Sequence, residues 1–360
     1  MMNTSFVEEA SRGRWDVARA RAWQESRGWL VGCNFTPSSA VNQLEMWQAE
    51  TFDPVTIDRE LGLLADLGMN TARVFLHDLV WTQDAKGFLA RIDKFLGLAE
   101  RRGIATMLVF FDSCWNPHPK AGPQPAPIPG VHNSRWAASP GTGILRDVPA
   151  FDRLEDYVTG VVAHFRDDRR ISTWDVWNEP NNFATGDYAD GITEEKKLET
   201  IMPFLAKAFQ WVRSANPTQP LTSGVWVGDW TFDEKITPLF RLQLTASDLI
   251  SFHWYGDLAT TRAAVEKLKV HGRPILCTEY IARAAGSTFE TILPYFKQEK
   301  IGAYNWGAVA GKIQTQYPWS AKAATPATAE PVPWHHDIFR PDGSPYDPKE
   351  AALIKSLLGR

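Results

Sequence analysis

Two glutamates, Glu179 and Glu279, stand where mostly apolar segments of the sequence end. Residues 171–177 and 274–278 are dominated by hydrophobic and aromatic side chains, and a carboxyl group closely follows each segment. A single buried carboxylate is costly without a partner, so two in such positions suggest a pair. Aromatic walls around Glu179 predict a raised pKa, as a general acid requires. Two facing carboxyl groups, one protonated and one ionised, are the equipment for cleaving a glycosidic bond.

A third charged residue, Arg73, lies inside the apolar run 70–76, where an isolated charge is not expected. It needs a carboxylate partner, and Glu279 or Glu179 is the natural candidate. An arginine beside a nucleophilic glutamate keeps that glutamate ionised. The alternative is a structural ion pair with another acidic residue at the same end of the fold.

Two further segments end in polar or aromatic residues that could share this site. His253 and Tyr255 alternate in phase after the apolar run that begins at 248, so both can point the same way. Trp306 ends another apolar run at 301–306. Taken alone, His253 fits a hydrogen-bonded core histidine and Trp306 fits a core tryptophan. These residues indicate a functional site only when they are considered together with the two glutamates.

The elements that position these residues recur as a unit of helix, glycine and strand. Gly68, Gly103 and Gly272 each follow a stretch with helical spacing and precede an apolar run, as a glycine at a helix C-terminus does. We expect strands at 28–35, 70–76, 104–111, 171–177, 221–227, 248–254, 274–279 and 301–306. We expect helices at 56–67, 89–102, 151–166, 194–214, 233–243, 260–270, 287–299 and 348–358.

The strands are near-continuous apolar runs, which is typical of parallel strands covered on both faces. Eight strands alternating with eight helices predict an α/β protein with one closed (β/α)₈ TIM barrel as a single domain over 1–360. A doubly wound sheet is the alternative, but no glycine-rich nucleotide turn follows the first strand. Long segments at 112–150 and 307–346 follow strands three and eight, so both emerge at the face where barrel active sites lie.

Composition narrows the class of protein. The chain has 360 residues, is 44% hydrophobic and 22% charged, and carries a formal net charge of −4, which argues against nucleic acid or an anionic membrane as the main partner. Sixteen tryptophans suggest stacking platforms for sugar rings as well as core.

The cysteines and the N-terminus bear on location. The three cysteines match neither a metal spacing nor a disulfide framework, and the polar N-terminus shows no signal peptide, so we expect a cytoplasmic protein. The oligomeric state is not indicated.

Taken together, these features resemble glycoside hydrolase clan A, nearest to family 5, the cellulase family. The resemblance covers roughly residues 28–310 and is carried by the combination of Asn178-Glu179-Pro180, Glu279, Arg73, His253-x-Tyr255 and Trp306. It implies a (β/α)₈ barrel and a retaining mechanism with neither a metal nor an organic cofactor.

The resemblance also implies roles for the polar residues. Glu179 would be the acid/base, and Glu279 would be the nucleophile that forms a glycosyl-enzyme. Asn178 would bind the sugar 2-hydroxyl. Arg73 and Tyr255 would hold Glu279 ionised and oriented.

Aromatic residues complete the site that the sequence predicts. His253 would contact the glycone or the acid/base, and Trp306 would form the floor of the −1 subsite. Trp115 and Trp136 lie in the segment 112–150, which together with 307–346 is expected to narrow the cleft into a pocket that favours exo-action.

The sequence departs from the family pattern after strand three, where a histidine is common. Here the chain reads Asp112-Ser113-Cys114. The nucleophile is followed by Tyr280-Ile281, where Phe or Trp and then Gly are more usual. The sugar, the linkage, exo or endo action, and hydrolysis or transglycosylation are therefore left open.

The leading hypothesis is a retaining β-glycosidase that hydrolyses β-linked glycosides or oligosaccharides. The alternatives are a catalytically silent carbohydrate-binding barrel and an endo-acting β-glucanase or β-mannanase. Metal-dependent hydrolysis would need clustered ligands at strand ends, whereas no His-x-His closes the first strand and His335-His336-Asp337 lies in a late loop.

Overall fold

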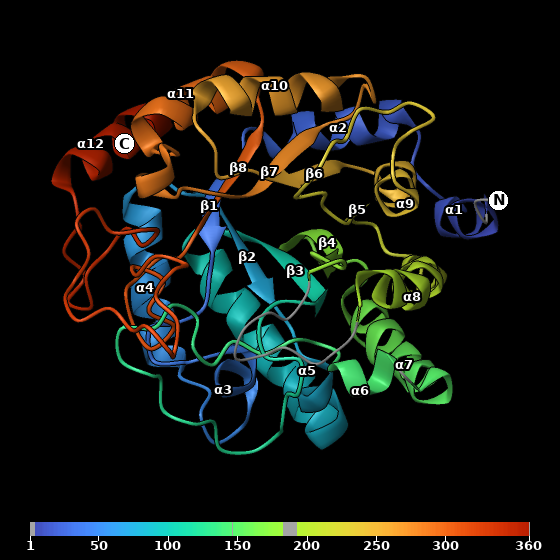
Figure 1. The fold of residues 1–360 in the computed structure, drawn as a ribbon, viewed down its shortest axis with the longest axis horizontal. Helices are drawn as coiled ribbons and strands as arrows, with labels where there is room; N and C mark the ends of the chain where they lie inside the picture. Colours follow the sequence, from blue (N-terminus) through green and yellow to red (C-terminus); the bar gives the residue numbers. More distant parts are fainter. Residues whose placement is uncertain (1–3, 146, 183–192, 360) are drawn as a thin grey trace.

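The computed structural model describes residues 4–145, 147–182 and 193–359, and its centre is a parallel eight-stranded sheet (Figure 1). The strand order is β5-β4-β3-β2-β1-β8-β7-β6. A parallel bridge between Val225 and Phe252 joins the chain just after β5 to β6, so the sheet curls back on itself. The predicted (β/α)₈ barrel is confirmed. The strands are β1 (Val31–Asn34), β2 (Thr71–Phe75), β3 (Ala105–Asp112), β4 (Ile171–Asn178), β5 (Leu221–Thr222), β6 (Ile250–His253), β7 (Ile275–Tyr280) and β8 (Gly302–Trp306).

Strand β5 is much shorter than the predicted 221–227. After Thr222 the chain replaces regular ladder bonds with side-chain hydrogen bonds. The backbone N–H of Ser223 donates to Ser247 Oγ at 3.1 Å, and Ser223 Oγ donates to the Trp177 carbonyl at 2.9 Å. Such local bonds to serine side chains compete with sheet pairing, and an apolar pattern does not reveal them.

Helices surround the barrel, and each predicted helix is present. The predictions 194–214 and 348–358 have the observed bounds, and the other helices have shifted ends. Helix α9 starts at Pro238 because Thr237 caps it and proline suits the first turn. Helix α5 starts earlier than predicted and contains a kink at Asp84. The helices are α1 (Thr4–Ser11), α2 (Val17–Arg27), α3 (Gln43–Trp47), α4 (Pro54–Asp66), α5 (Asp78–Arg101), α6 (Thr142–Leu145), α7 (Val148–Phe165), α8 (Glu194–Ser214), α9 (Pro238–Ala246), α10 (Leu258–Lys269), α11 (Phe289–Glu299) and α12 (Pro348–Leu358).

The N-terminal helices α1 and α2 were not predicted. Helix α2 buries only Ala20, so its sequence carries no apolar stripe. Both helices pack outside the barrel, and α1 contacts α8 and α9 (Figure 1).

The strands are buried on both faces, as their continuous apolar sequences predict. Every residue of β1, β2, β4, β6, β7 and β8 is buried. Side chains from all parts of the barrel join one large apolar cluster between strands and helices. Within the described residues, no helix is both long enough and apolar enough to cross a membrane.

The two long segments after β3 and β8 are bonded to each other on one side of the barrel mouth (Figure 1). Gln314 is central to the contact: its amide donates to the Ile128 carbonyl at 2.7 Å and accepts from Gly130 N–H at 2.9 Å. Backbone bonds from His132 to the Ala321 carbonyl (3.1 Å) and from Ala327 to the Gly130 carbonyl (2.9 Å) extend it. We call residues 128–136 and 313–327 the loop wall.

Candidate active site

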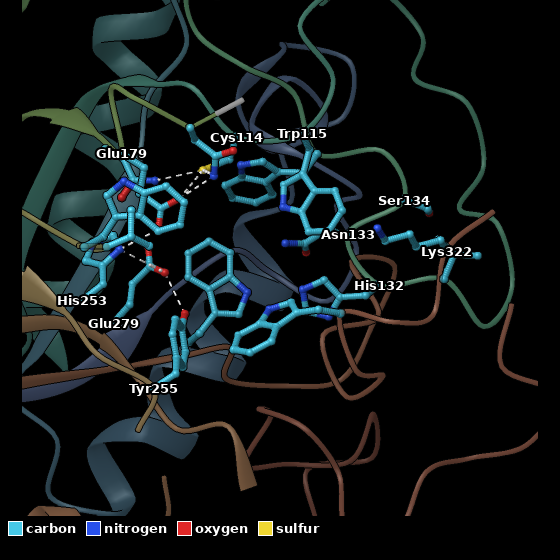
Figure 2. Close-up of a pocket in the computed structure, with 18 of the residues that line it drawn as sticks. Cys114, Trp115, His132, Asn133, Ser134, Glu179, His253, Tyr255, Glu279 and Lys322 are labelled. Atoms are coloured by element: carbon cyan, nitrogen blue, oxygen red, sulfur yellow. Dashed lines mark hydrogen bonds and ion pairs between the residues drawn. The ribbon is translucent and has the colours of Figure 1, made fainter. Parts of the chain in front are cut away.

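A pocket of about 770 Å³ opens at the C-terminal ends of the strands (Figure 2). This is the scale of pockets that enclose ligands larger than one sugar ring. Arg73, the eighth predicted site residue, is fully buried beneath it. The other seven predicted site residues line it: Trp115, Asn178, Glu179, His253, Tyr255, Glu279 and Trp306.

The backbone positions the two glutamates by irregularities at strand ends. Glu179 directly follows β4 and has a positive φ of 45°, a left-handed conformation that costs free energy in a residue other than glycine. Glu279 lies in β7, where the pairing with both β6 and β8 shifts register. Such shifts turn a side chain out of the regular alternation. Both carboxyl groups consequently point into the pocket (Figure 2).

The two carboxyl groups lie close together around His253. One oxygen of each carboxyl and a ring nitrogen of His253 all lie within 4.8 Å of one another. His253 Nδ1 is 2.8 Å from Glu179 Oε1 and 3.5 Å from Glu279 Oε2. Retaining glycosidases hold their two carboxyl groups about 5–5.5 Å apart, whereas inverting ones keep about 6.5–9.5 Å between theirs, so oxygens this close favour the retaining arrangement.

Arg73 connects Glu279 to the barrel interior. Its Nη1 donates to Glu279 Oε1 at 3.0 Å and to Asn34 Oδ1 at 2.7 Å. Its Nε and Nη2 donate to Asp175 Oδ2 at 3.0 and 2.8 Å. The predicted partner Glu279 and the alternative, a structural acidic residue, are therefore both present.

Burial dominates the electrostatics of the pair and raises the pKa of both carboxyl groups. At Glu279, the neighbouring His253, the positive Arg73 and the hydroxyl of Tyr255, which donates at 2.7 Å, oppose that rise, whereas the charge of Glu179 adds to it. At Glu179, the side chains of Asn182 and Cys114 and the charge of Arg73 oppose the rise. Two carboxyl groups this close disfavour double ionisation, so the pair can share one proton. Burial lowers the pKa of His253 to about 4, so its imidazole is neutral at higher pH.

Asn178 has both ends of its amide engaged. Its Oδ1 accepts from Arg73 Nη2 at 2.6 Å, and its Nδ2 donates to Asp112 Oδ1 at 2.9 Å. Asp112 also accepts from Trp136 Nε1 at 2.6 Å. Burial raises the pKa of Asp112, whereas these donors oppose the rise. Asp112 was not among the predicted site residues, although it ends β3.

Two residues that contact Glu179 were also absent from the predicted site. Asn182 Nδ2 donates to Glu179 Oε2 at 2.6 Å, and Cys114 Sγ lies 3.2 Å from the same oxygen. Cys114 lies in the segment after β3, Asp112-Ser113-Cys114, that the sequence analysis singled out as a departure from the pattern of the family it resembles. Its position at the end of β3, next to Asp112, was the available signal.

Aromatic rings form much of the pocket surface. Trp115 has a positive φ of 64° and packs against His132 of the loop wall, with 5.5 Å between ring centroids. Trp306 contacts Trp136 and Phe75 edge-on at 5.5 and 5.8 Å. Six tryptophans line the pocket in all: Trp115, Trp136, Trp226, Trp254, Trp306 and Trp319.

Glu179, His253 and Glu279 also form the one group of potential metal ligands that converges within the described residues. The guanidinium of Arg73, 3.0 Å from Glu279, adds a positive charge beside that group. A cation so close to a ligand oxygen opposes the binding of a divalent metal ion.

Comparison with known proteins gives a likeness in structure. No protein-family model matches the chain, and no curated protein matches it. Among solved structures, GH5_18 from Streptomyces cattleya in complex with GlcNAc is similar, with a TM-score of 0.60 at 14% identity over 92% of this chain and 80% of the other.

Two mannanases are similar as well. The beta-1,4-mannanase of the sea hare Aplysia kurodai gives a TM-score of 0.55 at 17% identity, over 77% of this chain and 87% of the other. The endo-beta-1,4-mannanase of Thermotoga petrophila gives 0.58 at 13% identity, over 94% and 77%. At these identities the likeness establishes the shared (β/α)₈ fold.

Proposed function

We propose that this protein is a retaining β-glycosidase of the clan A type, with the whole chain as one catalytic domain. It would hydrolyse β-linked glycosides or oligosaccharides without a metal or an organic cofactor. The observation that carries the proposal is the placement of one Glu179 and one Glu279 carboxyl oxygen within 4.8 Å of each other at the barrel mouth.

The cysteines support a proposal about location. The three cysteines of the chain are unpaired and buried, which supports a reducing, cytoplasmic location.

The reaction would proceed in two displacements. Glu279 attacks the anomeric carbon and forms a glycosyl ester, while the bond to the leaving-group oxygen breaks and Glu179 gives that oxygen its proton. Glu179, now ionised, takes a proton from water, and the hydroxide attacks the same carbon. Glu279 leaves as a carboxylate, so both residues return to their starting states.

The neighbouring side chains would support these steps. Arg73 and Tyr255 hydrogen-bond the two oxygens of Glu279, which keeps it ionised and oriented. Neutral His253 contacts the acid/base. Asn178 would face the sugar 2-hydroxyl, so one of its present amide contacts would be shared with the ligand.

The remaining aromatic residues would bind the sugar rings. Trp306 would form the floor of the −1 subsite, and Trp115 would form a side of it, since both line the pocket beside the carboxyl pair. The flat apolar face of a sugar ring suits such surfaces.

We also propose exo-action at the non-reducing end. The loop wall lies on the nucleophile side, because Tyr255, which bonds Glu279, packs edge-on against Trp319 at 4.9 Å. Glu279 carries the glycone, so a wall on this side limits glycone length. On the acid/base side, Trp226 lines the pocket and donates from Nε1 to Asn181 Oδ1 at 2.7 Å, close to Glu179 in the chain.

The substrate to test first is a β-mannoside. The similar structures include mannanases and a GH5_18 protein in complex with Manb1-4GlcNAc. Glucosides and xylosides belong in the same panel, because nothing in the described residues selects among these sugars.

The test is hydrolysis of aryl β-glycosides and β-linked oligosaccharides by the wild type and by Glu279→Gln. Loss of turnover on the order of 10⁴-fold in Glu279→Gln is expected. Glu290→Gln, an exposed change on α11, is the matched control and should leave turnover intact. Sugar binding without turnover would instead indicate a silent carbohydrate-binding barrel, and random internal cuts in a polymer would indicate an endo-acting enzyme.

A further inference from the structure

The two carboxyl oxygens of Glu179 have different surroundings. Oε1 lies 2.8 Å from His253 Nδ1, and the same nitrogen is 3.5 Å from Glu279 Oε2, so Oε1 is on the side of the second carboxyl. Oε2 contacts Asn182 Nδ2 at 2.6 Å and Cys114 Sγ at 3.2 Å. A glycosidic oxygen between the two carboxyls would therefore meet Oε1.

The direction of the thiol hydrogen follows from the other neighbours of Cys114. Asn178 Nδ2 and Asn182 Nδ2 each lie 3.4 Å from Sγ. Asn178 is oriented by Arg73, which donates to its Oδ1, so its amide nitrogen must face the sulfur. Amide nitrogens only donate, so the S–H group must point to a carboxylate. Asp112 and Glu179 both neighbour the thiol, and the acceptor at hydrogen-bonding distance on the pocket side is Glu179 Oε2, 3.2 Å from Sγ.

The thiol is held in place by its own backbone. The N–H of Cys114 donates to Asp112 Oδ1 at 3.1 Å, and Asp112 is buried at the end of β3. Burial raises the pKa of the Cys114 thiol well above its ordinary value, and the charge of Asp112 adds to the rise. The thiol thus keeps its hydrogen and remains a donor over the working pH range.

We propose that Cys114 is a positioning residue for Glu179: together with Asn182 it makes Oε2 a double acceptor and so confines the transferable proton to Oε1. The proposal rests on the proposed acid/base function of Glu179. A donor to the ionised carboxylate also holds the pKa of Glu179 down, so removal of the thiol raises that pKa.

The test measures the Glu179 carboxyl directly. Protein labelled with ¹³C at the glutamate carboxyl carbon is titrated by NMR, and the Glu179 signal is identified by its loss in Glu179→Gln. Cys114→Ala should raise the titration midpoint by about half a pH unit, the scale of one weak hydrogen bond. Cys114→Ser, which restores a donor, and Cys33→Ala, a buried thiol in β1, should stay near wild type. An unchanged midpoint in Cys114→Ala would overturn the proposal.

Kinetics separate positioning from general damage. A dinitrophenyl glycoside needs no proton on its leaving group, whereas an alkyl glycoside does. Cys114→Ala should lower kcat/KM about threefold to tenfold for the alkyl glycoside and leave the dinitrophenyl glycoside unchanged. Equal losses on both substrates would contradict the role. If the wild type turned over no glycoside, the proposed function would fail, while the NMR midpoint would still decide the role of Cys114.

Discussion

The guanidinium of Arg73 and the carboxylate of Glu279 meet at 3.0 Å through Nη1 and Oε1, where Arg73 is fully buried and Glu279 is exposed only slightly, at the base of the pocket. The same guanidinium bonds Asp175 at 2.8 Å. One buried cation thus compensates two carboxylates: Glu279 of the proposed catalytic pair and Asp175 within β4. The site and the stability of the fold depend on the same side chain.

Replacing Arg73 with methionine should therefore destabilise the protein. It leaves the carboxylates of Asp175 and Glu279 buried without their cation, and removing one partner of a buried ion pair costs about 3–5 kcal/mol. Urea unfolding at neutral pH measures the loss. Arg102→Met, which breaks an exposed pair with Asp58, is the control and should change stability little. If the two variants lost the same free energy of unfolding, the buried ion pairs of Arg73 would stabilise the fold no more than an exposed pair does.

The acid limb of the pH–rate profile should depend on Tyr255. Its hydroxyl donates to Glu279 at 2.7 Å and favours the ionised nucleophile. Tyr255→Phe removes this bond and raises the pKa of Glu279, so the acid limb of kcat/KM should move to higher pH, by about half to one pH unit. Tyr346→Phe, whose hydroxyl serves the backbone of Trp334, is the control. If the acid limb of kcat/KM did not move in Tyr255→Phe, Tyr255 would not hold Glu279 ionised.

The loop wall should control access to the pocket through Gln314. This side chain bonds Gly130, Ile128 and Val131 across the two segments. Gln314→Leu should raise KM for short glycosides about threefold to tenfold, as expected for one or two lost hydrogen bonds, with a smaller change in kcat. It should also allow some internal cleavage of polymers, seen in product profiles. The control Gln298→Leu on α11 should leave KM and the product profile at the wild-type level. If Gln314→Leu also left KM and the product profile unchanged, the loop wall would have no role in controlling access.

Activity should be independent of divalent metal ions. Glu179, His253 and Glu279 converge as metal ligands could, but the proposed reaction uses them for proton transfer and nucleophilic attack. Dialysis against a chelator should leave kcat/KM unchanged, and elemental analysis should find no stoichiometric metal. Activity that is lost on chelation and restored by zinc would favour metal-dependent hydrolysis.

The barrel itself was predictable because its strands are buried on both faces and therefore read as continuous apolar runs. Positions such as Glu179 and Glu279 stood out for the same reason, since a charge directly after such a run needs an explanation. The prediction was weaker where side chains replace ladder bonds, as at Ser223, and where a helix buries almost nothing, as α2 does around Ala20.

The contacts of Glu179 with Asn182 and Cys114 could not be predicted in the same way. They depend on the path of irregular segments after β4 and β3, and on the positive φ of Glu179. No periodicity encodes such a path. Only the position of Cys114 just after a strand end hinted that it belongs to the site.

In the proposed reaction Glu279 becomes covalently bonded to the glycone, and labelling tests this bond most directly. The protein is incubated with 2-deoxy-2-fluoro β-glycosides of mannose, glucose and xylose that carry a dinitrophenyl leaving group, and is then analysed as intact protein and as peptides by mass spectrometry. We expect one added fluoroglycosyl group, located on Glu279. A label on another residue, or turnover of the parent glycoside to an inverted α-product, would contradict this expectation.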